Sequence, residues 1–211
     1  MRSAVLAPWI DLAPLRSGAD LPGGLSANTR YQLRRSERAY AALGPVALER
    51  AATPAQAHAF LDELAALHQA TWRARGRSGA FTDPFFGRFH HALIDRGLPR
   101  GEIDLLRITA GWQVVGLLYN FRYRGRLLAY QSGFDYAGAA RHQKPGLTCH
   151  LLAARFAAAA GLDRYELLAG EDRYKTSLAE SATRLHWLDV GPSRPFARSL
   201  RRLARVVRAG R

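Results

Sequence analysis

The chain has 211 residues, 48% of them hydrophobic, and carries a formal net charge of +14 with an isoelectric point near 11.0. This size fits one globular domain with a substantial buried core. No apolar run approaches the ~20 residues that a membrane-spanning helix needs, and the single cysteine, Cys149, excludes an intramolecular disulfide. We expect Cys149 to be a small buried side chain rather than a nucleophile.

The positive charge favours polyanionic partners or anionic membrane surfaces. Arginine supplies nearly all of it, since Lys144 and Lys175 are the only lysines, and such a bias often reflects the coding genome. The N-terminus, which contains Pro8, Asp11 and Pro14, makes a poor signal peptide. We therefore expect a cytoplasmic protein, with peripheral contact at the inner membrane surface as a further option.

Helix-start signals dominate the first half of the chain. Residues 1–25 contain several prolines and glycines and predict an irregular lead-in with a short strand around Val5 to Ile10. Ser26 is a good N-cap, and Thr53-Pro54 and Asp83-Pro84 each combine an N-cap with a proline at the first helical position. The pattern predicts helices over 26–43, from 54 to a loop at 73, and over 84–96, with a strand over 46–50.

Strands dominate the second half. Segments 102–110, 113–121 and 127–134 predict an antiparallel meander with tight turns, followed by a helix over 146–160 and strands over 165–168 and 184–190. This order predicts an α+β or α/β fold, with a mixed central sheet that is flanked by helices and turns from antiparallel to parallel. We expect the domain to span 26–193. A basic amphipathic helix over 194–211 is expected to dock on it or to lie on an anionic membrane.

The unit from Leu127 to Lys175 is the most informative stretch. A strand, an alanine-rich helix opened by the loop 143–148 and a second strand form a crossover. The exposed amide groups and the dipole of such a helix N-terminus favour an anionic ligand beside the ends of parallel strands. This predicts a site for a phosphate-bearing cofactor; the alternative is an ordinary crossover whose loop binds nothing.

Four short motifs in this order resemble the GNAT acyltransferase fold. They are Trp72 with Gly76 and Gly79-Ala80-Phe81; Ser132-Gly133-Phe134-Asp135; Pro145-Gly146; and Gly170 with Tyr174-Lys175. The segment from Gly79 to Glu180 resembles the acetyltransferase family that includes the CelD-like cellulose-biosynthesis proteins and is related to Fem-type aminoacyl transferases. The resemblance covers about half of the chain.

The resemblance implies a cofactor site that binds acetyl-CoA or another acyl-CoA as co-substrate, without a metal. The GNAT pyrophosphate loop is matched except at its last position, where Thr148 replaces a small residue, and β-branched threonine can crowd a helix start. Pro145 donates no N–H, and Lys144 could compensate with its charge. The expected cofactor-binding residues are Gly133, Phe134, Gln143, Lys144, Pro145, Gly146, Leu147 and Thr148.

The resemblance also implies direct attack of an amine on the thioester, without an acyl-enzyme. Asp135 is the first candidate to deprotonate or orient the amine, followed by Glu171 and Asp172; capping a loop or pairing with a nearby arginine is the alternative role. Tyr174 lies where GNAT enzymes often keep a tyrosine that protonates the leaving thiolate. Lys175 is expected to bind a phosphate or an anionic substrate, or to stay solvated.

The acceptor is expected to be a small-molecule amine or a polymer precursor, in a pocket that Trp72, Arg73 and Phe81 could line together with Phe85 and Phe86. The alternative is that these aromatic residues belong to the core. Two alternatives remain open. One is Fem-like transfer from aminoacyl-tRNA, for which the excess of arginine offers an electrostatic reason. The other is a non-catalytic GNAT-shaped module that binds an anionic membrane or polymer through its basic ends. The sequence leaves the acyl chain and the oligomeric state open.

Overall fold

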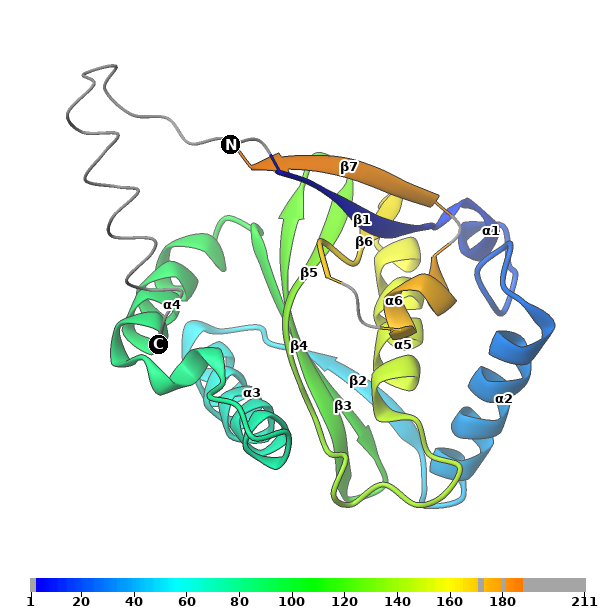
Figure 1. Cartoon of the computed structure of the whole chain (residues 1–211), viewed down its shortest axis with the longest axis horizontal. Helices are drawn as coiled ribbons and strands as arrows, with labels where there is room; N and C mark the ends of the chain where they lie inside the picture. The colour runs from blue at the N-terminus through cyan, green and yellow to red at the C-terminus, as the bar shows by residue number, and fades with distance from the viewer. Residues whose placement is uncertain (1–2, 171–172, 180, 188–211) are drawn as a thin grey trace.

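A mixed seven-stranded sheet forms the centre of the computed structural model, which describes residues 3–170, 173–179 and 181–187 (Figure 1). The strand order is β2-β3-β4-β5-β6-β1-β7. The strands are β1 (Ser3–Asp11), β2 (Val46–Arg50), β3 (Ile103–Ala110), β4 (Gln113–Tyr123), β5 (Arg126–Phe134), β6 (Arg164–Glu166) and β7 (Ser181–Trp187). The meander β3-β4-β5 is antiparallel and β5 pairs with β6 in parallel, so the predicted mixed sheet is confirmed.

The helices begin at the predicted caps. The side chains of Ser26, Thr53 and Asp83 accept hydrogen bonds from backbone N–H groups in the first turn, at 3.1, 3.2 and 2.8 Å. The helices are α1 (Ala13–Arg16), α2 (Ala27–Ala41), α3 (Pro54–Ala74), the 3₁₀ turn η1 (Ala80–Thr82), α4 (Pro84–Gly97), α5 (Pro145–Ala159) and α6 (Arg173–Leu178).

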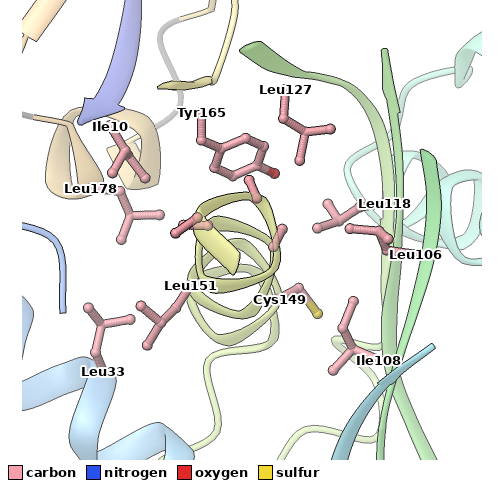
Figure 2. Packing of buried hydrophobic residues seen from close by; sticks show 14 of the residues in the cluster. Ile10, Leu33, Leu106, Ile108, Leu118, Leu127, Cys149, Leu151, Tyr165 and Leu178 are labelled. Carbon is pink, nitrogen blue, oxygen red and sulfur yellow. The ribbon is translucent and has the colours of Figure 1, made fainter. Parts of the chain in front are cut away.

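The helices cover both faces of the sheet. Figure 1 shows α3 and α4 on one side, and α1, α2, α5 and α6 on the other. Each side has its own core, and the larger one surrounds α5 (Figure 2), where Leu151 and Cys149 point toward Leu33 and Ile108 respectively. Cys149 is buried, as its position in the sequence predicted, and burial raises the pKa of its thiol.

The crossover β5-α5-β6 has an unusual feature at its strands. Arg126 to Leu128 of β5 pair with Arg164 to Glu166 of β6, but β5 continues to Phe134 without a β6 partner. After β6, the Leu167 N–H donates to the Pro8 carbonyl on β1 at 2.8 Å. The two parallel strands therefore part after Leu128, and the second half of β5 borders only β4.

The N-terminal segment is more regular than expected. The short strand predicted around Val5 to Ile10 is confirmed as β1, which extends over Ser3–Asp11 and lies inside the sheet, between β6 and β7. The Pro8 carbonyl faces Leu167, and N and C=O of one strand residue point to the same side. The missing N–H of Pro8 therefore removes no ladder bond to β7, which makes the proline tolerable.

The segment after β6 also differs from the expectation. β6 ends at Glu166, because Leu168 adopts a positive φ of 54°, and Tyr174 and Lys175 lie in the short helix α6 rather than in a loop. The last strand, β7, begins at Ser181, three residues before the predicted start at Arg184. The tail helix predicted over 194–211 and the residues Glu171 and Asp172 lie outside the described residues.

Close contact between α3 and β5 gives a test of this arrangement. A Cβ atom added at Gly133 would lie 2.4 Å from the Leu64 carbonyl oxygen, whereas one added at Gly87 in α4 meets nothing within 4 Å. We expect Gly133→Ala to lower the free energy of unfolding by about 1–3 kcal/mol through overpacking. Gly87→Ala should raise it by up to about 1 kcal/mol through helix propensity. Urea unfolding measures both, and equal stability of the two variants would contradict the packing described.

Candidate active site

The N-terminus of α5 presents backbone donors at the end of the crossover loop. Pro145 has no N–H, and the Thr148 N–H already donates to the Lys144 carbonyl at 3.0 Å. The Lys144 N–H donates to Ser36 Oγ at 2.8 Å. In the described part of the chain, this leaves the N–H groups of Gly146 and Leu147 without an acceptor, at the positive end of the helix dipole.

Two side chains of the predicted cofactor loop support the loop itself. Thr148 is fully buried, and its Oγ1 lies 2.8 Å from Ser36 Oγ, so the side chain points toward α2. Gln143 is buried too. Its Oε1 accepts the Ala140 N–H at 2.8 Å, and its Nε2 donates to the Ala39 carbonyl. A ligand at this site would therefore meet the backbone and the charge of Lys144, rather than Gln143 or Thr148.

A cluster of cations surrounds this loop. Arg35 on α2 donates from Nη2 to Nε2 of His142 at 2.7 Å. Desolvation and the positive charges of Arg35, Arg141 and Lys144 together lower the pKa of His142, which fits a neutral ring that accepts this bond. The fold thus brings an arginine of α2 to a loop more than a hundred residues further along the chain.

Gly146 allows a close approach at the same place. A Cβ atom there would lie 3.2 Å from the Tyr136 hydroxyl and 3.4 Å from the Phe134 ring. A larger residue would therefore fill the space between the first turn of α5 and the end of β5. Gly146 is itself buried, but its lack of a side chain and the N–H groups of Gly146 and Leu147 make the first turn a candidate cradle for an anion.

The free edge of β5 presents further backbone groups. The Asp135 N–H donates to the Val115 carbonyl on β4 at 3.1 Å, and the direction of peptide groups alternates along a strand. The N–H and C=O groups of Phe134 and Ser132 therefore face away from β4, toward the edge of β5 that has no β6 partner. The Ser132 carbonyl is bonded there by His68. The N–H groups of Ser132 and Phe134 thus point into the space between the parted strands.

Tyr174 belongs to a cluster of aromatic side chains beside the space between the parted strands β5 and β6, which we call the split. Its ring stacks on that of His150 on α5, with centroids 4.8 Å apart and planes 13° apart. Nδ1 of His150 lies 2.8 Å from the Tyr165 hydroxyl on β6, and Phe134 of β5 packs edge-on at 5.7 Å. Lys175 is buried, and its Nζ donates to the Ala169 carbonyl at 2.9 Å, so the lysine helps to hold α6 beside the end of β6. The sequence offered no spacing signal for this meeting of four elements.

Asp135 has a clear local role. Its Oδ1 accepts the Gly138 N–H at 2.8 Å, and its Oδ2 accepts from Nε2 of Gln113 at 3.4 Å. These contacts match the loop-capping role that the sequence allowed as an alternative. A role for Asp135 in deprotonating or orienting an amine stays a prediction.

The expected acceptor residues lie on the other face of β5. His68 on α3 contacts Trp72 at 5.9 Å and Phe81 at 5.3 Å between ring centroids, and Arg73 is exposed. Burial lowers the pKa of His68, although its bond to Ser132 opposes the shift. The neutral ring donates from Nδ1 to the Ser132 carbonyl at 3.1 Å, and Nε2 accepts the Ala80 N–H at 3.4 Å. In the fold His68 ties this cluster to β5.

The predicted residues thus form two groups separated by β5. One group, on the α5 side, contains Phe134, Gly146, Lys144 and Tyr174; the other, on the α3 side, contains Trp72, Arg73 and Phe81. Within the described ranges, no helix is long and apolar enough to cross a membrane, and no three His, Cys, Asp or Glu side chains gather in a way that could hold a metal ion.

The parted parallel strands, with a helix N-terminus at their mouth, define a GNAT-type acyltransferase fold. Residues 27–176 match the family model described as an acetyltransferase (GNAT) domain, and the chain belongs to this family. No protein of curated function matches the chain.

Two solved structures are similar to this chain at low identity, and the one with the higher TM-score shares the fold. A conserved protein of unknown function from Bacteroides thetaiotaomicron aligns with a TM-score of 0.59 at 10% identity, covering 88% of this chain and 60% of that one. The C-terminal domain of a protein described as a lysylphosphatidylglycerol synthetase from Agrobacterium fabrum aligns with a TM-score of 0.49 at 16% identity. This alignment covers 80% of this chain and 48% of that one. The chain therefore spans roughly half to three fifths of these structures.

Three buried histidines should make the free energy of unfolding depend on pH. Burial is the main cause that lowers the pKa of His68, His90 and His150, and that of His150 falls to about 3. Below pH 6.5 the unfolded chain binds protons that the folded chain does not, so stability falls as the pH is lowered toward the folded pKa values. For His150 alone the loss between pH 7.5 and 5.0 is about 2 kcal/mol.

Urea unfolding at the two pH values measures this effect, and the variant His150→Phe should show a smaller pH dependence than the native chain. A free energy of unfolding at pH 5.0 that equals or exceeds the value at pH 7.5 would contradict the prediction.

Proposed function

We propose that this protein is an acyl-CoA-dependent N-acyltransferase that moves an acyl group, such as acetyl, directly from the CoA thioester to an amine. One observation carries the proposal: the first turn of α5, whose Gly146 and Leu147 N–H groups have no acceptor in the described part of the chain, lies beside Lys144, Arg35 and Arg141 at the mouth of the split between β5 and β6.

The charge at this mouth fits the phosphates of CoA. A pyrophosphate gains hydrogen bonds from the N–H groups of Gly146 and Leu147 and attraction from the helix dipole. Lys144 adds a cation next to the missing N–H of Pro145. Because Gly146 has no side chain, phosphate oxygens can approach the backbone closely.

The split itself fits the thioester end. The N–H groups of Ser132 and Phe134 point into it and are candidates to stabilise negative charge on the thioester oxygen, as an oxyanion hole does. Cys149, the only cysteine, is buried with a raised pKa, which makes it a poor acyl carrier and favours direct attack by the amine.

The remaining chemistry needs a base or an orienting group for the amine and an acid for the sulfur. In this proposal Tyr174 donates its proton to the departing thiolate, and Asp135 orients the amine from the end of β5. Trp72, Phe81 and Arg73, on the opposite side of β5, receive the acceptor. Lys175, buried beside Tyr174, adds positive charge to the site.

Gly146→Glu tests the phosphate cradle. The new carboxylate would occupy the first turn of α5 and repel the phosphates, so we expect no CoA binding by isothermal titration calorimetry. Gly87→Glu, on α4 at the other face of the sheet, is the matched control, since its Cβ meets nothing within 4 Å. Retained CoA affinity in Gly146→Glu would remove the cradle from the proposal.

Tyr174→Phe tests the acid. The ring, and with it the stacking on His150, is kept while the hydroxyl is lost. We expect acetyl-CoA to bind with nearly unchanged affinity and turnover to fall by about 10²–10⁴-fold, the usual contribution of a general acid. A thiol-release assay over a panel of amines measures turnover, and an unchanged rate would exclude Tyr174 from the chemistry.

The two other classes left open by the sequence make different predictions. Aminoacyl-tRNA transfer would show as tRNA-dependent turnover and a steep loss of tRNA binding with salt, without CoA binding. A non-catalytic module would bind no CoA derivative and would sediment with anionic vesicles. Either result would replace the proposal.

A further inference from the structure

One buried polar atom near the split is left without a partner. His150 is only 1% exposed, and within the described part of the chain its Nε2 atom has no hydrogen-bond partner. Leaving a buried polar group unpaired typically costs about 1–3 kcal/mol, so such an atom indicates a missing partner.

The contacts of Tyr165 decide which nitrogen of His150 carries the proton. The Tyr165 side chain is fully buried, and its hydroxyl lies 2.8 Å from Nδ1 of His150. Burial raises the pKa of Tyr165 well above its usual value, so the hydroxyl keeps its proton and needs an acceptor. Nδ1 is that acceptor. The neutral ring therefore carries its single proton on Nε2, and the unpaired atom is an N–H donor.

The surroundings of this N–H match the sulfur end of a thioester. His150 lies between Phe134, at the end of β5, and the Tyr174 ring that stacks on it. The charge of Lys175 acts on the same ring, since it contributes to lowering the pKa of His150. A thiolate formed here would meet an N–H donor and a nearby cation, in a site with little water.

We propose that the Nε2–H group of His150 donates a hydrogen bond to the sulfur of the bound acyl donor and holds that sulfur against Tyr174. This inference rests on the proposed function and assigns His150 as a donor-binding residue. When the amine attacks, a carbon–nitrogen bond forms, the carbon–sulfur bond breaks and its electron pair goes to sulfur. Tyr174 supplies the proton that makes the thiol, and the proton released by the amine nitrogen restores Tyr174 through solvent. His150 keeps its own proton and only stabilises the charge.

Two substitutions separate the N–H from the rest of the side chain. In His150→Phe the ring remains for stacking but both nitrogens are lost. In His150→Gln the amide NH₂ can reach the position of Nε2. Both variants leave the Tyr165 hydroxyl without its present partner, so the difference between them reports the Nε2–H group itself.

We expect His150→Phe to lower kcat at least about tenfold, as for a lost hydrogen bond to a developing charge. His150→Gln should recover most of this loss. Because His150 stays neutral above pH 5, the loss in His150→Phe should be the same at every pH from 6 to 9. Equal activity of His150→Phe and native protein, or equal impairment of the two variants, would overturn the inference.

Nuclear magnetic resonance of ¹⁵N-histidine-labelled protein gives a readout that does not depend on turnover. We expect His150 to be the neutral Nε2–H tautomer, and its Nε2 resonance to move when CoA is added. If CoA binds the native protein by calorimetry but this resonance does not move, the inference fails and the proposed function stands. If the native protein binds neither CoA nor acetyl-CoA, both fail.

Discussion

The hydrogen bond from the Leu167 N–H to the Pro8 carbonyl holds the chain after β6 against β1 rather than against β5. Because of this, β6 follows β5 for only three residue pairs, and the end of β5 is left with one edge unpaired. The peptide groups on that edge, the first turn of α5 and the ring of Tyr174 all face the space that results. The shape of the candidate site therefore depends on the bond between Leu167 and Pro8 of β1.

Local signals predicted the parts of the fold that local chemistry determines. Ser26, Thr53 and Asp83 cap their helices by bonds to residues two or three positions away, and such bonds can be inferred from a sequence. The loop before α5 was found from the strand–helix–strand pattern and the family resemblance, since its N-cap Lys144 makes no side-chain capping bond. The role of Ser36 beneath that loop was not, because its partners Lys144 and Thr148 lie more than a hundred residues further on.

Other features were not predicted, for physical reasons as well. The sequence indicated the strand β1 but not its place between β6 and β7, because its partners lie more than 150 residues further on. α6 is a short helix fastened by Lys175 to the Ala169 carbonyl and by the stacking of Tyr174 on His150. Polar residues after a glycine suggested a loop, and tertiary contacts made a helix.

The position of β1 has a consequence for how the protein is made. Ile10 pairs with Tyr165, so β1 can take its place only after almost the whole described chain has been synthesised. Contacts of such large sequence separation slow folding, because a long loop must close before they form. The β3-β4-β5 meander can assemble earlier from contacts between neighbouring strands. On the ribosome, the split between β5 and β6 is therefore among the last features to acquire its final shape.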